Sequence, residues 1–171
     1  METEDGRTRA GSARVAQPRW LVKAGQMAEM WTMTFDSSDP PALAAFWKTA
    51  LGYVDAAPPP GFADWEASFR HFGVAEDEWG DAAYLEDPSG RGPRISFLRV
   101  PEPKVAKNRI HLDIQAGGGR GVPWEIRAPR VRAAVEQLVA AGATVVREDV
   151  VDGRLDHVVM ADPEGNEFCV V

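Results

Sequence analysis

Four side chains capable of metal binding or proton transfer fall on two segments that alternate like β-strands. His111 and Asp113 lie two residues apart in one segment, and Glu167 and Cys169 lie two residues apart in the other. Because successive side chains of a strand point to opposite faces, each pair shares one face. Zinc accepts a mixed set of imidazole nitrogen, thiolate sulfur and carboxylate oxygen, and a histidine beside a carboxylate can transfer protons. The alternation within each strand does not by itself bring the two segments together. Metal binding or proton transfer by these four side chains therefore depends on how the chain folds.

Each of these residues also has a structural interpretation. His111 fits a buried histidine that hydrogen-bonds its neighbours, and Cys169 fits a small apolar filler. His71 and His157 have no such pattern around them and are predicted to be surface or structural residues. The run Gly117-Gly118-Gly119 lacks the strand-turn-helix context of a phosphate loop, and it predicts a flexible connection.

The predicted secondary-structure elements that position these residues occur twice along the chain. Residues 83–90 and 158–165 each read as a strand that enters an Asp-Pro-x-Gly turn, and a further apolar strand follows each turn. Upstream of each copy lie an alternating strand and an amphipathic helix closed by glycine, within residues 30–52 and 110–142. The sequence predicts an α+β fold of two tandem βαβββ modules. One such module cannot bury its apolar sheet face alone, so two copies packed together are expected to leave a concave cavity between them.

In the first half, a strand is predicted from Met30 to Asp36, and Asp39 and Pro40 suit the start of a helix that ends at Gly52. Its apolar face contains Leu43, Phe46, Trp47, Ala50 and Leu51. A short strand at residues 53–56 follows. The insertion after it carries a second helical pattern from Phe62 to Gly73 and has no counterpart in the second half. We interpret this insertion as a packing helix, and a lid over the cleft is the alternative.

In the second half, strands are predicted at residues 109–115, 144–148, 155–160 and 167–171. The helix between the first two has an apolar face and ends at Gly142. The members of this face are Val131, Ala134, Val135, Leu138 and Val139.

Composition and charge narrow the class of partner. A chain of 171 residues with 44% hydrophobic residues can bury a shared core, so one domain of two halves is expected. A formal charge of -7, with no run of Lys or Arg, argues against nucleic acid and anionic membranes as partners. A single cysteine excludes an intrachain disulfide, and the acidic start has no signal-peptide pattern, so a cytoplasmic location is expected. No apolar stretch approaches the roughly 20 residues of a membrane span.

The domain boundaries follow from the same pattern. Residues 1–26 have no sustained apolar periodicity and are predicted to form a disordered tail. Residues 27–171 form the domain, with module one at 27–100 and module two at 107–171. Met27 is an alternative to Met1 as the natural start.

Four motifs together resemble a known superfamily. They are Phe35-Asp36-Ser37-Ser38-Asp39-Pro40, Ala50-Leu51-Gly52-Tyr53, Asn108-Arg109-Ile110-His111-Leu112-Asp113 and Asp162-Pro163-Glu164-Gly165-Asn166-Glu167-Phe168. The chain resembles the vicinal oxygen chelate superfamily, which includes glyoxalase I, bleomycin resistance proteins and extradiol dioxygenases, and most closely its bacterial glyoxalase-like members. The resemblance spans about residues 27–171 and implies paired βαβββ modules whose curled mixed sheets surround a central cleft.

The resemblance also implies where a metal would bind, because the metal-dependent members take ligands from the first and last strand of each module. Counting along the motifs places Thr32, Ser96, His111 and Cys169 at these positions, with Leu98 replacing Ser96 if the register slips. Neutral hydroxyls leave the charge of a divalent cation uncompensated, and only His111 matches the family type.

The leading hypothesis is therefore a small-molecule-binding protein of the bleomycin-resistance type, with no cofactor and with a metal-free cleft. Two alternatives remain open: a glyoxalase-type or dioxygenase-type lyase or isomerase that uses a divalent metal, and an enzyme that uses His111 for acid–base chemistry with Asp113 or Glu167. A homodimer is also left open. The ligand-binding candidates are Thr32, Thr34, Ser96, His111, Asp113, Glu167 and Cys169.

Overall fold

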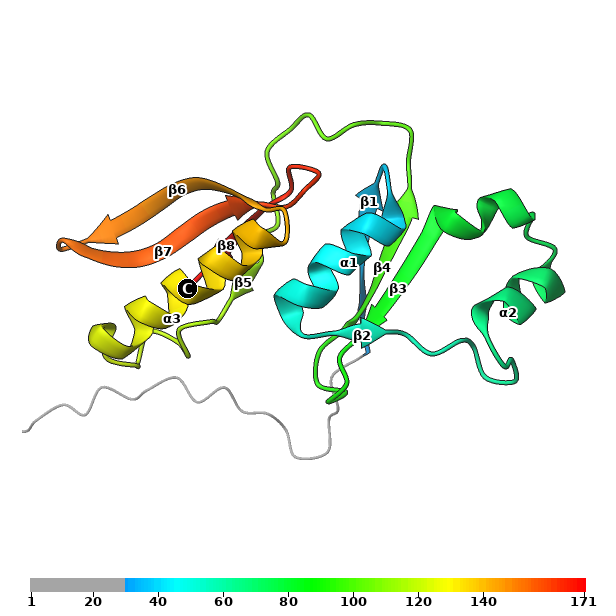
Figure 1. The fold of residues 1–171 in the computed structure, drawn as a ribbon, viewed down its shortest axis with the longest axis horizontal. Helices are drawn as coiled ribbons and strands as arrows, with labels where there is room; N and C mark the ends of the chain where they lie inside the picture. The colour runs from blue at the N-terminus through cyan, green and yellow to red at the C-terminus, as the bar shows by residue number, and fades with distance from the viewer. Residues whose placement is uncertain (1–29) are drawn as a thin grey trace, which may run out of the picture.

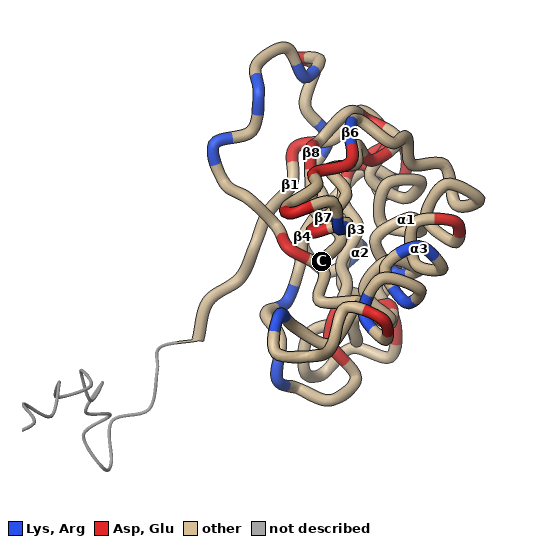
Figure 2. The backbone as a smooth tube through the Cα atoms, turned by 90° about the vertical axis from the view of Figure 1, so that its left-hand side faces the viewer, with Lys and Arg blue, Asp and Glu red and all other residues tan. Residues whose placement is uncertain are grey.

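The computed structural model describes residues 30–171 and arranges them mainly in two layers (Figure 1). One layer consists of two β-sheets. The helices α1 (Pro40–Leu51) and α3 (Trp124–Ala140) form the other layer, on the same side of both sheets (Figure 2). The predicted tail of residues 1–26 lies outside the described residues.

The two sheets repeat one topology, as the duplicated sequence predicts. The strand order is β1-β4-β3-β2 in the first sheet and β5-β8-β7-β6 in the second. In each sheet the first strand pairs in parallel with the last, and the other pairings are antiparallel. The prediction of two tandem βαβββ modules is confirmed.

Module one has the longer list of elements because it contains the insertion. In chain order these are β1 (Thr32–Ser37), α1, β2 (Val54–Asp55), α2 (Trp65–Phe72), the 3₁₀ helix η1 (Glu76–Asp81), β3 (Ala82–Glu86) and β4 (Arg94–Arg99). Module two contains β5 (Asp113–Ile114), α3, β6 (Thr144–Val151), β7 (Arg154–Ala161) and β8 (Glu167–Val170).

The structure corrects three of the sequence predictions. The strand predicted over residues 109–115 is reduced to the two residues of β5, because residues 109–111 belong to the linker. The Leu112 carbonyl, directly before β5, still accepts a hydrogen bond from the Cys169 N–H of β8. The helix predicted from Phe62 begins at Trp65, where the Asp64 side chain accepts a hydrogen bond from the Ala67 N–H. The glycine run at 117–119 does lie between a strand, β5, and a helix, α3, so the strand-turn-helix context is present.

Helix α1 forms where its capping residues predict. Asp39 accepts a hydrogen bond from the Ala42 N–H, and Gly52 ends the helix in the left-handed conformation with a φ of 68°. Leu43, Phe46 and Trp47 are buried, which confirms the predicted apolar face. They pack on the sheet residues of a single core cluster that also includes Phe97, Val131, Met160 and Phe168.

The two modules meet at Trp47. Its ring lies 5.2 Å from the ring of Phe168 in module two, and the Phe46 ring lies 6.0 Å from the same Phe168. The Trp47 indole N–H donates to the Asp162 carboxylate at 3.1 Å. Two aromatic contacts with Phe168 and one buried hydrogen bond therefore help to fix the junction between the modules.

Within residues 30–171, no helix combines the length and the apolar character that crossing a membrane would require.

Candidate functional site

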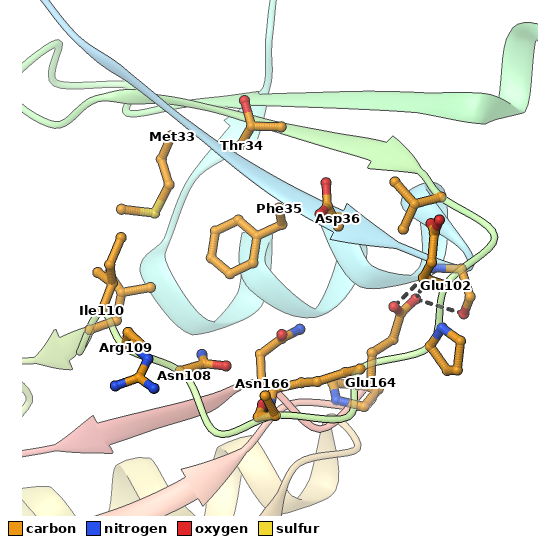
Figure 3. Close-up of a pocket in the computed structure, with 17 residues that line it drawn as sticks. Met33, Thr34, Phe35, Asp36, Glu102, Asn108, Arg109, Ile110, Glu164 and Asn166 are labelled. Atoms are coloured by element: carbon orange, nitrogen blue, oxygen red, sulfur yellow. Dashed lines mark hydrogen bonds between the residues drawn. The ribbon is translucent and has the colours of Figure 1, made fainter.

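The candidate site is a pocket of about 840 Å³ at the junction between the modules (Figure 3). Three segments enclose it: strand β1, the linker that follows β4, and the turn between β7 and β8. Its apolar lining is Met33, Phe35, Val100, Pro103, Ala106, Ile110, Leu112 and Pro163. Its polar lining is Thr34, Asp36, Ser38, Glu102, Lys104, Asn108, Arg109, Glu164 and Asn166.

The alternation of β1 decides which side chains enter this pocket. Met33 and Phe35 are partly buried against the core, whereas Thr34 and Asp36 are exposed. Figure 3 shows Phe35 on the side of Asn108, with Thr34 and Asp36 on the other side of the strand. The apolar side of β1 therefore forms a wall of the pocket, and Thr34 lies at its rim.

Glu164 connects the turn of module two to the start of α1. Its carboxylate accepts hydrogen bonds from the Ser38 and Asp39 N–H groups and from the Ser37 hydroxyl, all between 2.8 and 3.0 Å. Partial burial acts to raise the pKa of Glu164, but these donors hold it below its ordinary value. The carboxylate is therefore already bound by the protein, and it holds one end of the pocket closed.

Glu167 fastens the linker to β8. The Lys104 ammonium lies 2.9 Å from its carboxylate, and the Asn108 N–H donates to the same oxygen at 3.0 Å. The hydrogen bond from Lys104 and then that from Asn108 lower the pKa of Glu167 to about 2. Glu167 was predicted to contact ligand; in the structure its contacts hold the linker wall in place.

The pocket is polar at both ends and apolar between them. Arg109 lies beside Ile110 at one end, and Asp36 and Glu102 lie at the other (Figure 3). None of the ion pairs between described residues involves Arg109, Asp36 or Glu102. These charges are therefore available to a ligand that presents a charged or polar group at either end.

The other predicted site residues lie on the sheet face opposite the helices. Thr34 pairs with Ser96, and Asp113 pairs with Cys169. Thr32 pairs with Arg94, two residues before Ser96. Counting along the motifs gave Thr32 and His111 as the first-strand positions. The residues that pair with Ser96 and Cys169 are instead Thr34 and Asp113, each two positions later in the chain.

His111 precedes β5 and is exposed. Its Nε2 lies 3.4 Å from the Lys107 ammonium. Its neighbours Ile110 and Leu112 line the junction pocket, whereas His111 does not. Of the seven predicted ligand-binding residues, Thr34 is the one that lines this pocket.

Neither of the other two histidines lines the junction pocket. His157 lies between two carboxylates, with Nε2 at 2.9 Å from Asp149 and Nδ1 at 3.0 Å from Asp156. The His71 ring packs 5.1 Å from the ring of Phe62. Both positions agree with a structural role.

Three of the four donors in the register pairs Thr34–Ser96 and Asp113–Cys169 are poor ligands for a divalent cation. Thr34 and Ser96 offer neutral hydroxyls, which are weak ligands. Burial, and then the neighbouring Asp113 carboxylate, raises the pKa of the Cys169 thiol, which disfavours the thiolate that zinc requires. Among residues 30–171, no group of three or more His, Cys, Asp and Glu side chains is arranged to hold a metal ion.

Sequence reasoning missed most of the residues that line the junction pocket. Asn108, Arg109, Glu164 and Asn166 all belong to the motifs that carry the family resemblance. Arg109 was placed at the start of a predicted strand and the other three outside the strands, and none of the four was predicted as a site residue. Their signal was a cluster of polar residues next to the strand ends, where loops form binding sites.

Sequence comparison decides the family. A family model described as a glyoxalase-like domain matches residues 32–171. The chain belongs to this glyoxalase-like domain family, within the vicinal oxygen chelate superfamily. Comparison with curated protein sequences found no match.

Three solved structures are similar to this glyoxalase-like protein. A glyoxalase/bleomycin resistance protein/dioxygenase family enzyme from Burkholderia phytofirmans PsJN is 16% identical, with a TM-score of 0.52, over 84% of this chain and 97% of that one. A possible glyoxalase from Bacillus cereus is 12% identical, with a TM-score of 0.53, over 85% and 99%. The fosfomycin resistance protein FosX from Mesorhizobium loti is 8% identical, with a TM-score of 0.51, over 85% and 91%. At these identities the similarities show the fold alone.

Proposed function

We propose that this protein binds a small amphipathic molecule in the junction pocket and sequesters or presents it, as a bleomycin-resistance-type protein would. The observation that carries the proposal is the pocket itself. Its volume of about 840 Å³ lies in the range typical of small-molecule sites, and apolar walls with a few polar groups are typical of such sites. The fosfomycin resistance protein among the similar structures makes an antibiotic-sized ligand a reasonable class to test.

Binding without metal or cofactor is part of this proposal. The hydroxyls of Thr34 and Ser96 and the weakly acidic Cys169 thiol support it, because they are poor ligands for a divalent cation. The alternative enzyme, which uses His111 as an acid or base, has less support. His111 lies beside Lys107, and Glu167 is bound to Lys104. We further propose a cytoplasmic location, because the single cysteine excludes an intrachain disulfide. A homodimer is left open.

The experiment compares a variant that fills the pocket with one that does not. Ile110 lines the pocket and is 74% exposed, so Ile110→Trp narrows the pocket without overpacking the core. Val105 lies in the same linker, is 90% exposed and is not a lining residue, so Val105→Trp is the matched control. The melting temperature of each protein is measured against a panel that includes fosfomycin, bleomycin and amphipathic metabolites.

At least one compound is expected to raise the melting temperature of the wild type and of Val105→Trp, but not that of Ile110→Trp. Equal responses of the two variants would move the ligand away from this pocket. The proposed function would be contradicted if no compound of the panel stabilised the wild type and native mass spectra of the purified protein showed no bound small molecule.

A further inference from the structure

A second pocket, of about 620 Å³, lies at the start of α3 and shares no lining residue with the junction pocket. The loop before α3, the first turn of α3 and the hairpin between β6 and β7 enclose it. Three arginines line it, Arg120, Arg127 and Arg154, together with Trp124. Asp152 and Asp156 are the carboxylates in the lining.

The N-terminus of α3 opens onto this pocket without a capping side chain. The N-cap residue is Pro123, and no side chain hydrogen-bonds the first turn. The first N–H groups of an α-helix have no partner within the helix, and they carry a partial positive charge. In a helix that extends over Trp124–Ala140, this positive end favours an anion nearby.

Two buried donors in the same lining also have no acceptor among the described residues. They are Nη1 of Arg127 and the indole N–H of Trp124. Arg127 is only 9% exposed. Because buried polar groups in native proteins are almost always paired, two orphan donors side by side on one turn of helix point to an acceptor supplied from outside the chain.

The glycine run before α3 makes room for Arg127. A Cβ atom on Gly117 would lie 2.3 Å from Cγ of Arg127, so a larger residue would displace this side chain. Gly118 and Gly119 have φ angles of 88° and 93°, in the left-handed region that favours glycine. Gly117 thus leaves space for the Arg127 side chain, and Gly118 and Gly119 allow the loop its backbone conformation.

The charges in the pocket leave an excess of cations. Asp156 is neutralised within the protein, by Arg120 at 2.7 Å, Arg127 at 3.7 Å and the His157 ring at 3.0 Å. Arg154 stacks over the Trp124 ring at 5.5 Å and belongs to none of the ion pairs between described residues. Asp152, at the tip of the hairpin, is the remaining opposing charge.

We propose that this second pocket binds a phosphate group, held by Arg127, Arg154, the Trp124 indole N–H and the N-terminus of α3. Guanidinium groups and a helix N-terminus both match the charge and the acceptor oxygens of phosphate. The proposal is independent of the junction pocket. It leaves two sources for the ligand, free phosphate or the phosphoryl group of a small molecule.

The test measures phosphate binding to the full chain by calorimetry and by melting temperature, with sodium chloride at the same ionic strength as reference. Phosphate is expected to raise the melting temperature above the chloride value. Trp124→Phe removes one donor and keeps the ring, and Arg154→Gln removes an exposed charge; each is expected to weaken binding about tenfold. Neither change creates a buried unpaired charge, so both variants are expected to fold, even if Arg127→Gln does not.

Arg132→Gln is the matched control. Arg132 is on the same helix, pairs with Glu148 at 3.7 Å and is not in the pocket, so its loss removes the same charge. Equal weakening in Arg132→Gln and Arg154→Gln, or no difference between phosphate and chloride in the wild type, would overturn the proposal. Glycerol phosphate that binds more tightly than free phosphate would identify a phosphoryl group of a larger ligand, and equal affinity would identify free phosphate.

Discussion

The two Asp-Pro-x-Gly turns have nearly the same sequence and different surroundings. In module two, Asp162 is 3% exposed and accepts hydrogen bonds from the Trp47 indole N–H and from Asn166. In module one, the donors to Asp87 among residues 30–171 all belong to its own loop: Ser89, Arg91 and Gly92. The second turn therefore joins the modules, whereas the first closes only itself.

The difference shows that the motif specifies a local turn, and that the residues around it decide whether the turn becomes a junction. Glu164 occupies the third position of the second turn and reaches the start of α1. Ser89 occupies the same position of the first turn and is too short to reach beyond its loop; it bonds to Asp87. The junction pocket lies beside the second turn for this reason.

The largest expected effect distinguishes these two aspartates. Asp162→Ala leaves the buried indole N–H of Trp47 without an acceptor, so the free energy of unfolding is expected to fall by about 3 kcal/mol. Asp87→Ala is expected to destabilise the protein less, because its donors turn to water. Urea denaturation of both variants measures the difference. Equal losses would show that the first turn also supports the junction.

Glu164→Ala tests the second link of the junction. It removes the acceptor for the N–H groups of Ser38 and Asp39, and a loss of about 1 to 2 kcal/mol in unfolding free energy is expected, as for a helix cap. Ser89→Ala is the matched change in the first turn and is expected to cost less. Hydrogen exchange at the first turn of α1 should become faster in Glu164→Ala and remain unchanged in Ser89→Ala.

A second comparison joins Glu167 and Arg94, which lie two residues before Cys169 and Ser96, the partners of Asp113 and Thr34 in the two sheets. Glu167 holds the linker through Lys104 and Asn108. Arg94 stacks against Trp65 and Tyr84, at 5.6 and 5.4 Å, and so holds the insertion. Equivalent positions in the two modules therefore fasten the two segments that are not repeated.

Glu167→Gln makes this second comparison measurable through pH. The pKa of Glu167 falls from its ordinary value of 4.5 to about 2 in the folded protein. A lowered carboxylate pKa stabilises the fold above the unfolded pKa, and this contribution is lost as the pH falls from about 4.5 towards 2. We expect the variant to be less stable than the wild type by about 1 kcal/mol at pH 7, and the difference to shrink below pH 4.5. A difference that stays constant from pH 7 to pH 3 would contradict this account.

The fold could be predicted from the sequence because its signals are local and repeated. The caps at Asp39 and Gly52, the alternation of β1 and the duplicated turn each depend on near neighbours, and all are confirmed. β5 was predicted too long because Ile110 and Leu112 alternate like strand residues. Both line the junction pocket, and the register with β8 begins at Asp113, next to the hydrogen bond from the Cys169 N–H to the Leu112 carbonyl.

The candidate site could be predicted only in part, because it forms between segments that are far apart in the chain. Glu164 contacts Ser38 across more than a hundred residues, and no local pattern encodes this contact. The alternation of the first strand suggested Thr34, because this pattern depends on one strand. It missed Asn108 and Arg109, which enter the site because Glu167 fixes the linker.

The smallest expected effect concerns His111, for which the sequence interpretation and the pocket geometry predict different results. His111 is exposed and its two neighbours, Ile110 and Leu112, line the junction pocket. From this geometry, His111→Ala should change the unfolding free energy by less than about 0.5 kcal/mol and leave ligand-induced stabilisation intact. Thr32→Ala, at the equivalent position of module one, should have the same small effect. The unfolding free energy and the ligand-induced stabilisation of both variants are measured beside those of Ile110→Trp with the same compounds. If His111→Ala abolishes the stabilisation while Ile110→Trp retains it, the ligand lies on the sheet face of Asp113 and Cys169, where the sequence interpretation expects it.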